Sequence, residues 1–152
     1  MTDSTIPKVT VEMPYARTLG PVVGRFLSGL RAGEIWANTT VTGKVQCPPF
    51  EYDPMTGAAA TGDWVQLSGV GTVTTWARVD EPLRNHLLQK PFAWCLIRLD
   101  GADTDLLHAV DAGSRDRISS GTRVKVRWRN DRIGHIKDIE CFEPMQPIGE
   151  GS

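Results

Sequence analysis

The second half of the chain consists of short β-strand patterns, and these patterns limit the fold more than any other feature of the sequence. Residues 122–128, TRVKVRW, alternate strictly between basic and apolar side chains, as a half-buried strand does. Residues 91–101, PFAWCLIRLDG, have the pattern of a buried strand that ends in a turn. Further strand patterns cover residues 63–79, 105–110 and 135–144. The connections between these patterns are short, which favours a compact all-β unit.

Roughly five or six strands within residues 63–144 predict a small Greek-key barrel, such as an OB-fold. The Ser68-Gly69 pair interrupts the first strand pattern and indicates a bend or a bulge. Gly69-Val70-Gly71 is too short for a dinucleotide-binding loop, so we interpret it as a bend of the barrel.

Residues 19–34, LGPVVGRFLSGLRAGE, form the best helix candidate. Apolar side chains recur there at spacings of three and four, which makes one apolar stripe. Pro21 suits a first helical turn and Gly33 suits a stop after the last one. The polar residues 1–18 predict an irregular arm, and residues 145–152 predict a tail.

A stiff segment lies between the helix and the barrel. VQCPPFEYDPMTG, residues 45–57, holds three prolines, and each proline removes a backbone donor and fixes φ. The segment therefore predicts neither a helix nor a central strand. The preceding residues 35–45, IWANTTVTGKV, have the Thr-rich composition of a hairpin arm.

Composition excludes several classes of protein. A net charge of −1 gives no general reason to expect nucleic acid or an anionic membrane as a partner. No apolar run approaches the roughly 20 residues that a membrane span needs. The start of the chain lacks a signal-peptide pattern, and its three cysteines are odd in number and widely spaced. We therefore expect a reducing, cytoplasmic location.

The sequence shows no pattern of an enzyme that acts alone. His86, His108 and His135 are far apart and share no ligand or triad spacing. No nucleophile elbow, zinc-protease or phosphate-loop motif occurs. Among the cysteines, Cys95 lies in an apolar strand pattern, and Cys47 is the one we expect to be most exposed. We expect no catalytic residue in this chain.

Six pieces of sequence, taken in order, resemble a known family. They are FLSGLRAGEI, GKVQCPP, LSGVGTVTTWARV, PFAWCLIRLDG, SSGTRVKVRW and ECFEP, and together they cover roughly residues 20–144. The resemblance is to the acyl-CoA-associated family that joins a rubredoxin-like zinc ribbon to an OB-fold, also called domain of unknown function 35. It implies a mainly β chain with a helix at 19–34, a degenerate zinc-ribbon segment at 35–62 and an OB-fold Greek-key barrel at 63–144.

The family's zinc ribbon carries one pair of cysteines before its paired prolines and one pair after them. In this chain Thr39 and Thr42 stand in the first pair of places, where the alignment can shift by one residue. Asp53 and Thr56 stand in the second pair. Threonine hydroxyls are poor zinc ligands, so we expect zinc to be absent. The turns are then expected to be held by Asp and Thr side chains that bond to backbone N–H groups.

The resemblance implies a non-catalytic accessory subunit of a thiolase-like, lipid-transfer-protein-like or aldolase-like enzyme that acts on acyl-CoA thioesters. Such a subunit forms a hetero-oligomer, stabilises its partner and helps to form the acyl-CoA channel, for example in lipid or aromatic-acid degradation. The residues expected to bind the partner are Trp36, Pro48, Pro49, Phe50 and Tyr52. The candidates for contact with CoA are Lys44, Arg127 and Arg129.

Two alternatives remain open at this point. Basic side chains at Arg123, Lys125 and Arg127 share one strand face, and aromatic residues interleave with basic ones in OB-folds that bind single-stranded nucleic acid. The second alternative is a stand-alone acyl-CoA-binding module. A solvated strand face explains the same basic residues without either function.

Overall fold

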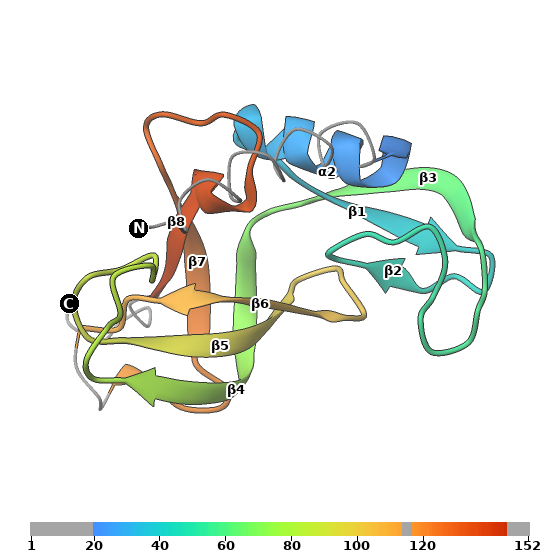
Figure 1. Ribbon diagram of the computed structural model, residues 1–152. Helices are drawn as coiled ribbons and strands as arrows, with labels where there is room; N and C mark the ends of the chain where they lie inside the picture. Colours follow the sequence, from blue (N-terminus) through green and yellow to red (C-terminus); the bar gives the residue numbers. More distant parts are fainter. Residues whose placement is uncertain (1–19, 114–116, 146–152) are drawn as a thin grey trace, which may run out of the picture.

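The computed structural model describes residues 20–113 and 117–145. The expected arm at 1–18 and all but the first residue of the expected tail at 145–152 lie outside the described residues. The described chain forms a helix, a three-stranded sheet and a closed five-stranded barrel (Figure 1). The mainly β fold with an N-terminal helix and an OB-type barrel is therefore confirmed.

Helix α2 (Gly20–Arg31) occupies the stretch that the apolar spacing indicated. Its buried side is formed by Phe26, Gly29 and Leu30. The helix ends in a Schellman motif, since the N–H of Gly33 donates to the carbonyl of Leu30 (2.9 Å) and that of Glu34 to the carbonyl of Gly29 (2.8 Å). Gly33 has φ +79°, a value that residues with a side chain rarely adopt, so it is the natural stop.

The three-stranded sheet follows the helix and is called the small sheet here (residues 35–67). It has the strand order β2-β1-β3 and consists of β1 (Ile35–Thr40), β2 (Val45–Gln46) and β3 (Ala60–Leu67). Both strand pairs are antiparallel. Two turn regions, residues 40–44 and 47–59, connect the strands and carry the prolines of the stiff segment.

The barrel consists of β4 (Val70–Val79), β5 (Phe92–Leu99), β6 (Asp105–Val110), β7 (Arg123–Trp128) and β8 (Ile139–Pro144). Its strand order is β4-β5-β6-β8-β7, and β7 pairs with β4 to close the cylinder. All pairs are antiparallel except β6 with β8, which is parallel. A short 3-10 helix, η2 (Ile136–Asp138), leads into β8.

The boundary between the small sheet and the barrel differs from the expected one. We placed the start of the barrel at residue 63, but β3 pairs with β1, so the barrel strands begin at Val70. Gly69 makes the break, because it has φ +89° and an added Cβ would lie 2.6 Å from Cγ1 of Val126. The chain can therefore turn from one sheet into the other only at a residue without a side chain.

One apolar core joins the two sheets. The barrel contributes large buried side chains that include Ile97, Val124 and Phe142, while the small sheet and α2 contribute Ile35 and Leu30. A loop of the barrel also binds the small sheet by hydrogen bonds, as described below. None of the described helices is long and apolar enough to cross a membrane.

Candidate functional site

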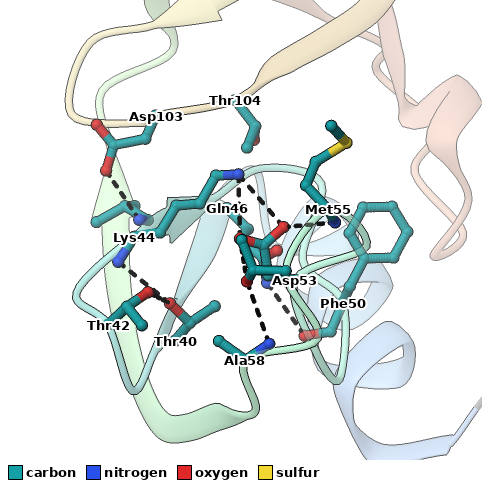
Figure 2. Close-up of polar contacts among 12 residues, drawn as sticks. Thr40, Thr42, Lys44, Gln46, Phe50, Asp53, Met55, Ala58, Asp103 and Thr104 are labelled. Atoms are coloured by element: carbon teal, nitrogen blue, oxygen red, sulfur yellow. Dashed lines mark hydrogen bonds and ion pairs between the residues drawn. The ribbon is translucent and has the colours of Figure 1, made fainter.

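The turn at residues 53–57 is organised around the carboxylate of Asp53, which is buried. Oδ1 accepts a hydrogen bond from the N–H of Met55 (2.9 Å), and Oδ2 accepts one from the hydroxyl of Thr56 (3.0 Å). The hydroxyl of Thr56 in turn accepts from the N–H of Ala58 (3.2 Å). Figure 2 shows Asp53 at the centre of these contacts. The bond from Met55, together with those from Lys44 and Thr56, holds the pKa of Asp53 below its usual range despite burial.

The turn at residues 40–44 is tied to that carboxylate by a salt bridge. Nζ of Lys44 lies 3.2 Å from Oδ2 and 3.3 Å from Oδ1 of Asp53. On the same turn the hydroxyls of Thr40 and Thr42 lie 2.9 Å apart, and that of Thr40 accepts from the N–H of Lys44 (3.2 Å). Asp and Thr side chains therefore hold both turns, as the sequence predicted, although Thr40 takes the role expected of Thr39.

The residues present here do not fit a zinc site. The first pair of ligand places offers threonine hydroxyls, and the second offers one carboxylate whose two oxygens already bind an ammonium group. A divalent cation beside Nζ of Lys44 would meet a like charge. Within residues 20–113 and 117–145, no three His, Cys, Asp or Glu side chains come close enough to hold a metal ion.

Beneath the turns, a second set of hydrogen bonds holds the proline segment. The side-chain amide of Asn38 donates to the carbonyl of Phe50 (2.8 Å), and that of Gln46 donates to the side-chain oxygen of Asn38 (3.3 Å). Both amides are almost wholly buried, so these bonds are not shared with solvent. They fix the backbone at Phe50 in one position.

The small sheet is also fastened to the barrel through the β5–β6 loop. The N–H of Val45 donates to the carboxylate of Asp103 (2.9 Å), and the N–H of Asp103 donates to the carbonyl of Val45 (2.8 Å). The hydroxyl of Thr104 accepts from the N–H of Cys47 (2.9 Å) and donates to its carbonyl (3.0 Å). Strand β2 therefore has a fixed place against the barrel.

The residues expected to bind a partner are only partly exposed. Phe50 and Tyr52 expose 45% and 58% of their surface, but Pro49 is buried and Pro48 half-buried. Two further apolar residues on the turns, Val41 (65%) and Met55 (83%), are more exposed than either aromatic residue. Sequence reasoning missed them because it looked for aromatic side chains.

An apolar groove lies beside the two exposed aromatic residues. It has a volume of about 340 Å³ and is lined by Val22 and Val23 of α2 and by the segment Pro49–Pro54 apart from Asp53. Phe50 and Tyr52 both line it, so the helix and the proline segment share one surface.

Trp36 lies away from that groove and packs within the molecule. Its ring is half-buried on α2, where the guanidinium of Arg25 lies 4.9 Å from the ring centroid, and its Nε1 donates to Glu34 (3.0 Å). The same guanidinium lies 5.0 Å from the ring of Trp64 on β3. Trp36 thus joins the helix to the small sheet.

The three candidates for CoA contact are not brought together. Lys44 is bound to Asp53 in the small sheet, whereas Arg127 and Arg129 line a cleft on the barrel that Lys44 does not line. Arg127 binds three carboxylates, those of Asp111 (3.1 Å), Glu140 (3.0 Å) and Glu143 (3.1 Å). Of the three side chains, Arg129 is exposed, whereas Lys44 and Arg127 are half-buried.

The cysteine thiols lie in the interior, which corrects the expectation that Cys47 is exposed. Cys47 is fully buried at the end of β2, and burial raises its pKa to about 12. Burial likewise raises the pKa of Cys95 to about 12 and that of Cys141 to about 11. All three groups are neutral thiols at pH 7 and therefore poor nucleophiles.

The histidines occupy three separate places. His108 is buried on β6 against the ring of Phe142, and burial lowers its pKa. Nδ1 of His86 accepts from the N–H of Leu83 (3.0 Å), and Nδ1 of His135 accepts from the N–H of Lys137 (3.0 Å). Each ring thus has a structural contact of its own.

Comparisons with known proteins agree with this geometry. Residues 64–129 match the family model described as the C-terminal OB-fold domain of ChsH2. The chain is similar to a solved structure described as "Ltp2-ChsH2(DUF35) aldolase", with 19% identity, a TM-score of 0.57 and coverage of 78% of this chain and 91% of that chain. It is also similar to a DUF35 family protein of unknown function from Sulfolobus solfataricus, with 18% identity, a TM-score of 0.56 and coverage of 83% and 91%. No curated protein matches the chain.

The fold defines a two-part protein, in which a small three-stranded sheet is joined to a closed five-stranded OB-type barrel. In this protein, residues 64–129 resemble the C-terminal OB-fold domain of ChsH2. The resemblance to the DUF35 family inferred from the sequence is therefore confirmed, and the solved structures extend the likeness in fold to the small sheet.

Proposed function

We propose that this chain is a non-catalytic accessory subunit of an aldolase-like or thiolase-like enzyme. The similarity to a structure described as an Ltp2-ChsH2(DUF35) aldolase supports an enzyme subunit as the partner. The chemistry would lie in that partner, because the thiols of this chain are buried and neutral and its histidines are separated. The setting proposed for the complex is cytoplasmic degradation of lipids or aromatic acids, by analogy of fold alone.

The observation that carries the proposal is a rigid, exposed apolar surface on the small sheet. Val41, Phe50, Tyr52 and Met55 expose between 45% and 83% of their surface. The backbone beneath them is fixed by the bonds around Asp53, so little conformational entropy is lost when a partner binds. Exposed apolar groups on rigid turns are typical of a protein interface.

The groove beside α2 gives this surface a specific shape. Its volume of about 340 Å³ suits a large apolar side chain of the partner, and its lining from Val22, Val23 and Pro54 is mostly apolar. Phe50 and Tyr52 form its other side. Aromatic side chains that a partner buries on binding commonly provide the strongest contacts of an interface.

The complex is proposed to act on acyl-CoA thioesters, with this chain forming part of the channel. Of the three candidates for CoA contact, Arg129 is the one whose guanidinium is exposed and without a salt bridge to any described residue. Lys44 is held by Asp53 and Arg127 by three acids, so both are weaker candidates than the sequence suggested.

Co-expression with a candidate aldolase-like or thiolase-like enzyme tests the proposal. We expect the two polypeptides to co-purify, and the double variant Phe50→Ala/Tyr52→Ala to weaken the complex about tenfold or more. The matched control is Leu83→Ala/Leu107→Ala, which removes two exposed apolar side chains from the barrel (62% and 59% exposed) and should leave the complex intact.

Two results would overturn the proposal. One is turnover of an acyl-CoA thioester by the isolated chain with no other polypeptide present. The other is complex formation that depends on Leu83 and Leu107 but not on Phe50 and Tyr52, since the docking surface would then lie on the barrel.

A further inference from the structure

The apolar groove beside α2 contains one charged side chain, that of Glu51. The residues that line the groove are Val22, Val23, Pro49, Phe50, Glu51, Tyr52 and Pro54. Glu51 is exposed, and no residue within 20–113 or 117–145 forms a salt bridge or a side-chain hydrogen bond with its carboxylate. The described part of the chain therefore leaves this negative charge without a counter-charge.

Other charged side chains of the small sheet and α2 have contacts within the molecule. Nζ of Lys44 lies 3.2 Å from the carboxylate of Asp53. The guanidinium of Arg25 lies over the ring of Trp36, 4.9 Å from its centroid. Glu51 differs from these residues because its charge is unpaired and stands in an otherwise apolar lining.

The backbone that carries Glu51 is fixed on both sides. The carbonyl of Phe50 accepts a hydrogen bond from the side-chain amide of Asn38 (2.8 Å), and the carbonyl of Glu51 accepts one from the N–H of Ala60 (2.9 Å). Oε2 of Glu51 lies 3.4 Å from the point that a Cβ at Gly20 would occupy, so the carboxylate stands beside the first turn of α2. A partner therefore meets this charge at a defined end of the groove.

The unpaired carboxylate restricts what can cover the groove. A partner that presents only apolar atoms would remove water from Glu51 and leave a charge without a counter-ion, which is unfavourable. A partner that brings a cation to the same place offsets this loss of hydration. Complementary charges at the edge of an interface also speed association and exclude wrong partners.

We propose that the groove receives a partner segment in which a lysine or an arginine neighbours a large apolar side chain. This inference rests on the docking surface proposed above and specifies its partner. The apolar side chain fills the space between α2 and the rings of Phe50 and Tyr52, and the cation pairs with Glu51. Glu51 is then a specificity-determining residue, because a segment with an acid at that place would bring two like charges together.

Affinity measurements with the candidate enzyme of the co-expression test, at low and at high salt, test this pairing. At low salt we expect Glu51→Gln to bind about tenfold more weakly than the wild type, and Glu51→Lys about a hundredfold more weakly, because lysine repels the partner's cation. The difference between the wild type and Glu51→Gln should shrink as salt is raised. The matched control is Asp63→Asn, which removes an exposed acid of β3 outside the groove and should bind as the wild type does.

Thermal unfolding of the same variants separates binding from folding. The first turn of α2 has no acid of its own, so the carboxylate of Glu51 could instead stabilise the start of the helix. We expect Glu51→Gln to lose affinity without a matching loss of thermal stability. A variant that melts earlier but binds the enzyme as tightly as the wild type would assign Glu51 to the helix and overturn the inference.

Three further outcomes would overturn the inference. An equal loss of affinity in Glu51→Gln and Asp63→Asn would mean a general charge effect. Tighter binding of Glu51→Lys would mean that the partner presents an acid. Self-association of the isolated chain in sedimentation, lost in Glu51→Lys, would mean that a second copy fills the groove. A complex that forms but ignores every change at Glu51 overturns this inference alone, whereas the absence of any complex overturns the proposed function as well.

Discussion

The barrel and the small sheet reach a fixed shape by different means. The barrel closes on itself, and its strands bury large side chains such as Ile97, Leu99 and Phe142 completely. The small sheet has an eight-residue strand, β3, in which only Leu67 is buried. Its turns depend instead on polar side chains such as Asp53.

This difference assigns separate tasks to the two parts. Burial of apolar surface stabilises by roughly 25 cal/mol per Å², so the barrel gains its stability from its own core. A hydrogen bond contributes only about 1 kcal/mol net, so the small sheet depends on its attachment to the barrel through Asp103 and Thr104. The barrel supplies stability, while the small sheet supplies an exposed surface of fixed shape.

The largest effect is expected from removal of a core side chain of the barrel. Phe142 is fully buried and packs against His108, with ring centroids 5.6 Å apart. Phe142→Ala should lower the free energy of unfolding by about 3–5 kcal/mol in urea titrations. Leu107→Ala, on an exposed face of β6, should change it by less than about 0.5 kcal/mol. Equal effects of the two substitutions would mean that the buried side chains of the barrel contribute no more to its stability than the exposed ones.

A smaller effect is expected where α2 meets the small sheet. A Cβ added at Gly29 would lie 2.5 Å from Cδ1 of Trp36, so Gly29→Ala must displace the indole ring. We expect a loss of about 1–3 kcal/mol of unfolding free energy. Gly24 lies on the same helix with no atom within 4 Å of its Cβ position. Gly24→Ala should therefore be neutral or stabilising, by up to about 1 kcal/mol from helix propensity.

The turns of the small sheet should respond to pH through Asp53. Its pKa in the folded chain is lowered, so ionised Asp53 stabilises the turn above the unfolded pKa of about 3.9, and this contribution is lost as the pH falls through the folded value. The amide signal of Met55, which donates to this carboxylate, should titrate in that acid range in NMR spectra.

Asp53→Asn is the matched test of that titration. It removes the charge that binds Lys44, so the acid transition at Met55 should disappear and hydrogen-exchange protection there should fall about tenfold at neutral pH. Amides of β5 and β6 should keep their protection. Loss of protection throughout the barrel would show that the two parts do not differ in the way proposed.

Local patterns in the sequence were sufficient for much of the fold. Apolar spacing placed α2, strict alternation placed β7, and the number of short strands predicted a closed barrel. The role of Asp53 and Thr56 could also be predicted, because Asp and Thr side chains reach backbone groups two or three residues away. Each of these features is determined within a few residues of chain.

Features that depend on distant parts of the chain could not be predicted in the same way. The pairing of β3 with β1, the burial of Cys47 and the salt bridge between Lys44 and Asp53 each need the folded arrangement. Composition likewise does not show that Lys90, Lys125 and Arg127 line one cleft on the barrel, because these residues come from separate segments that the fold brings together.

The smallest effect is expected from a metal chelator. The salt bridge between Lys44 and Asp53 joins the two turns at which the sequence resemblance places the ligand pairs of a zinc ribbon, and the ammonium group already supplies a positive charge there. Prolonged treatment with a strong zinc chelator should therefore leave both the urea midpoint and the protection of Met55 unchanged, and elemental analysis should find no stoichiometric zinc. One equivalent of zinc, lost together with the protection of Met55, would mean that the turns are held by a metal and that the contrast between a packed barrel and a polar sheet is wrong.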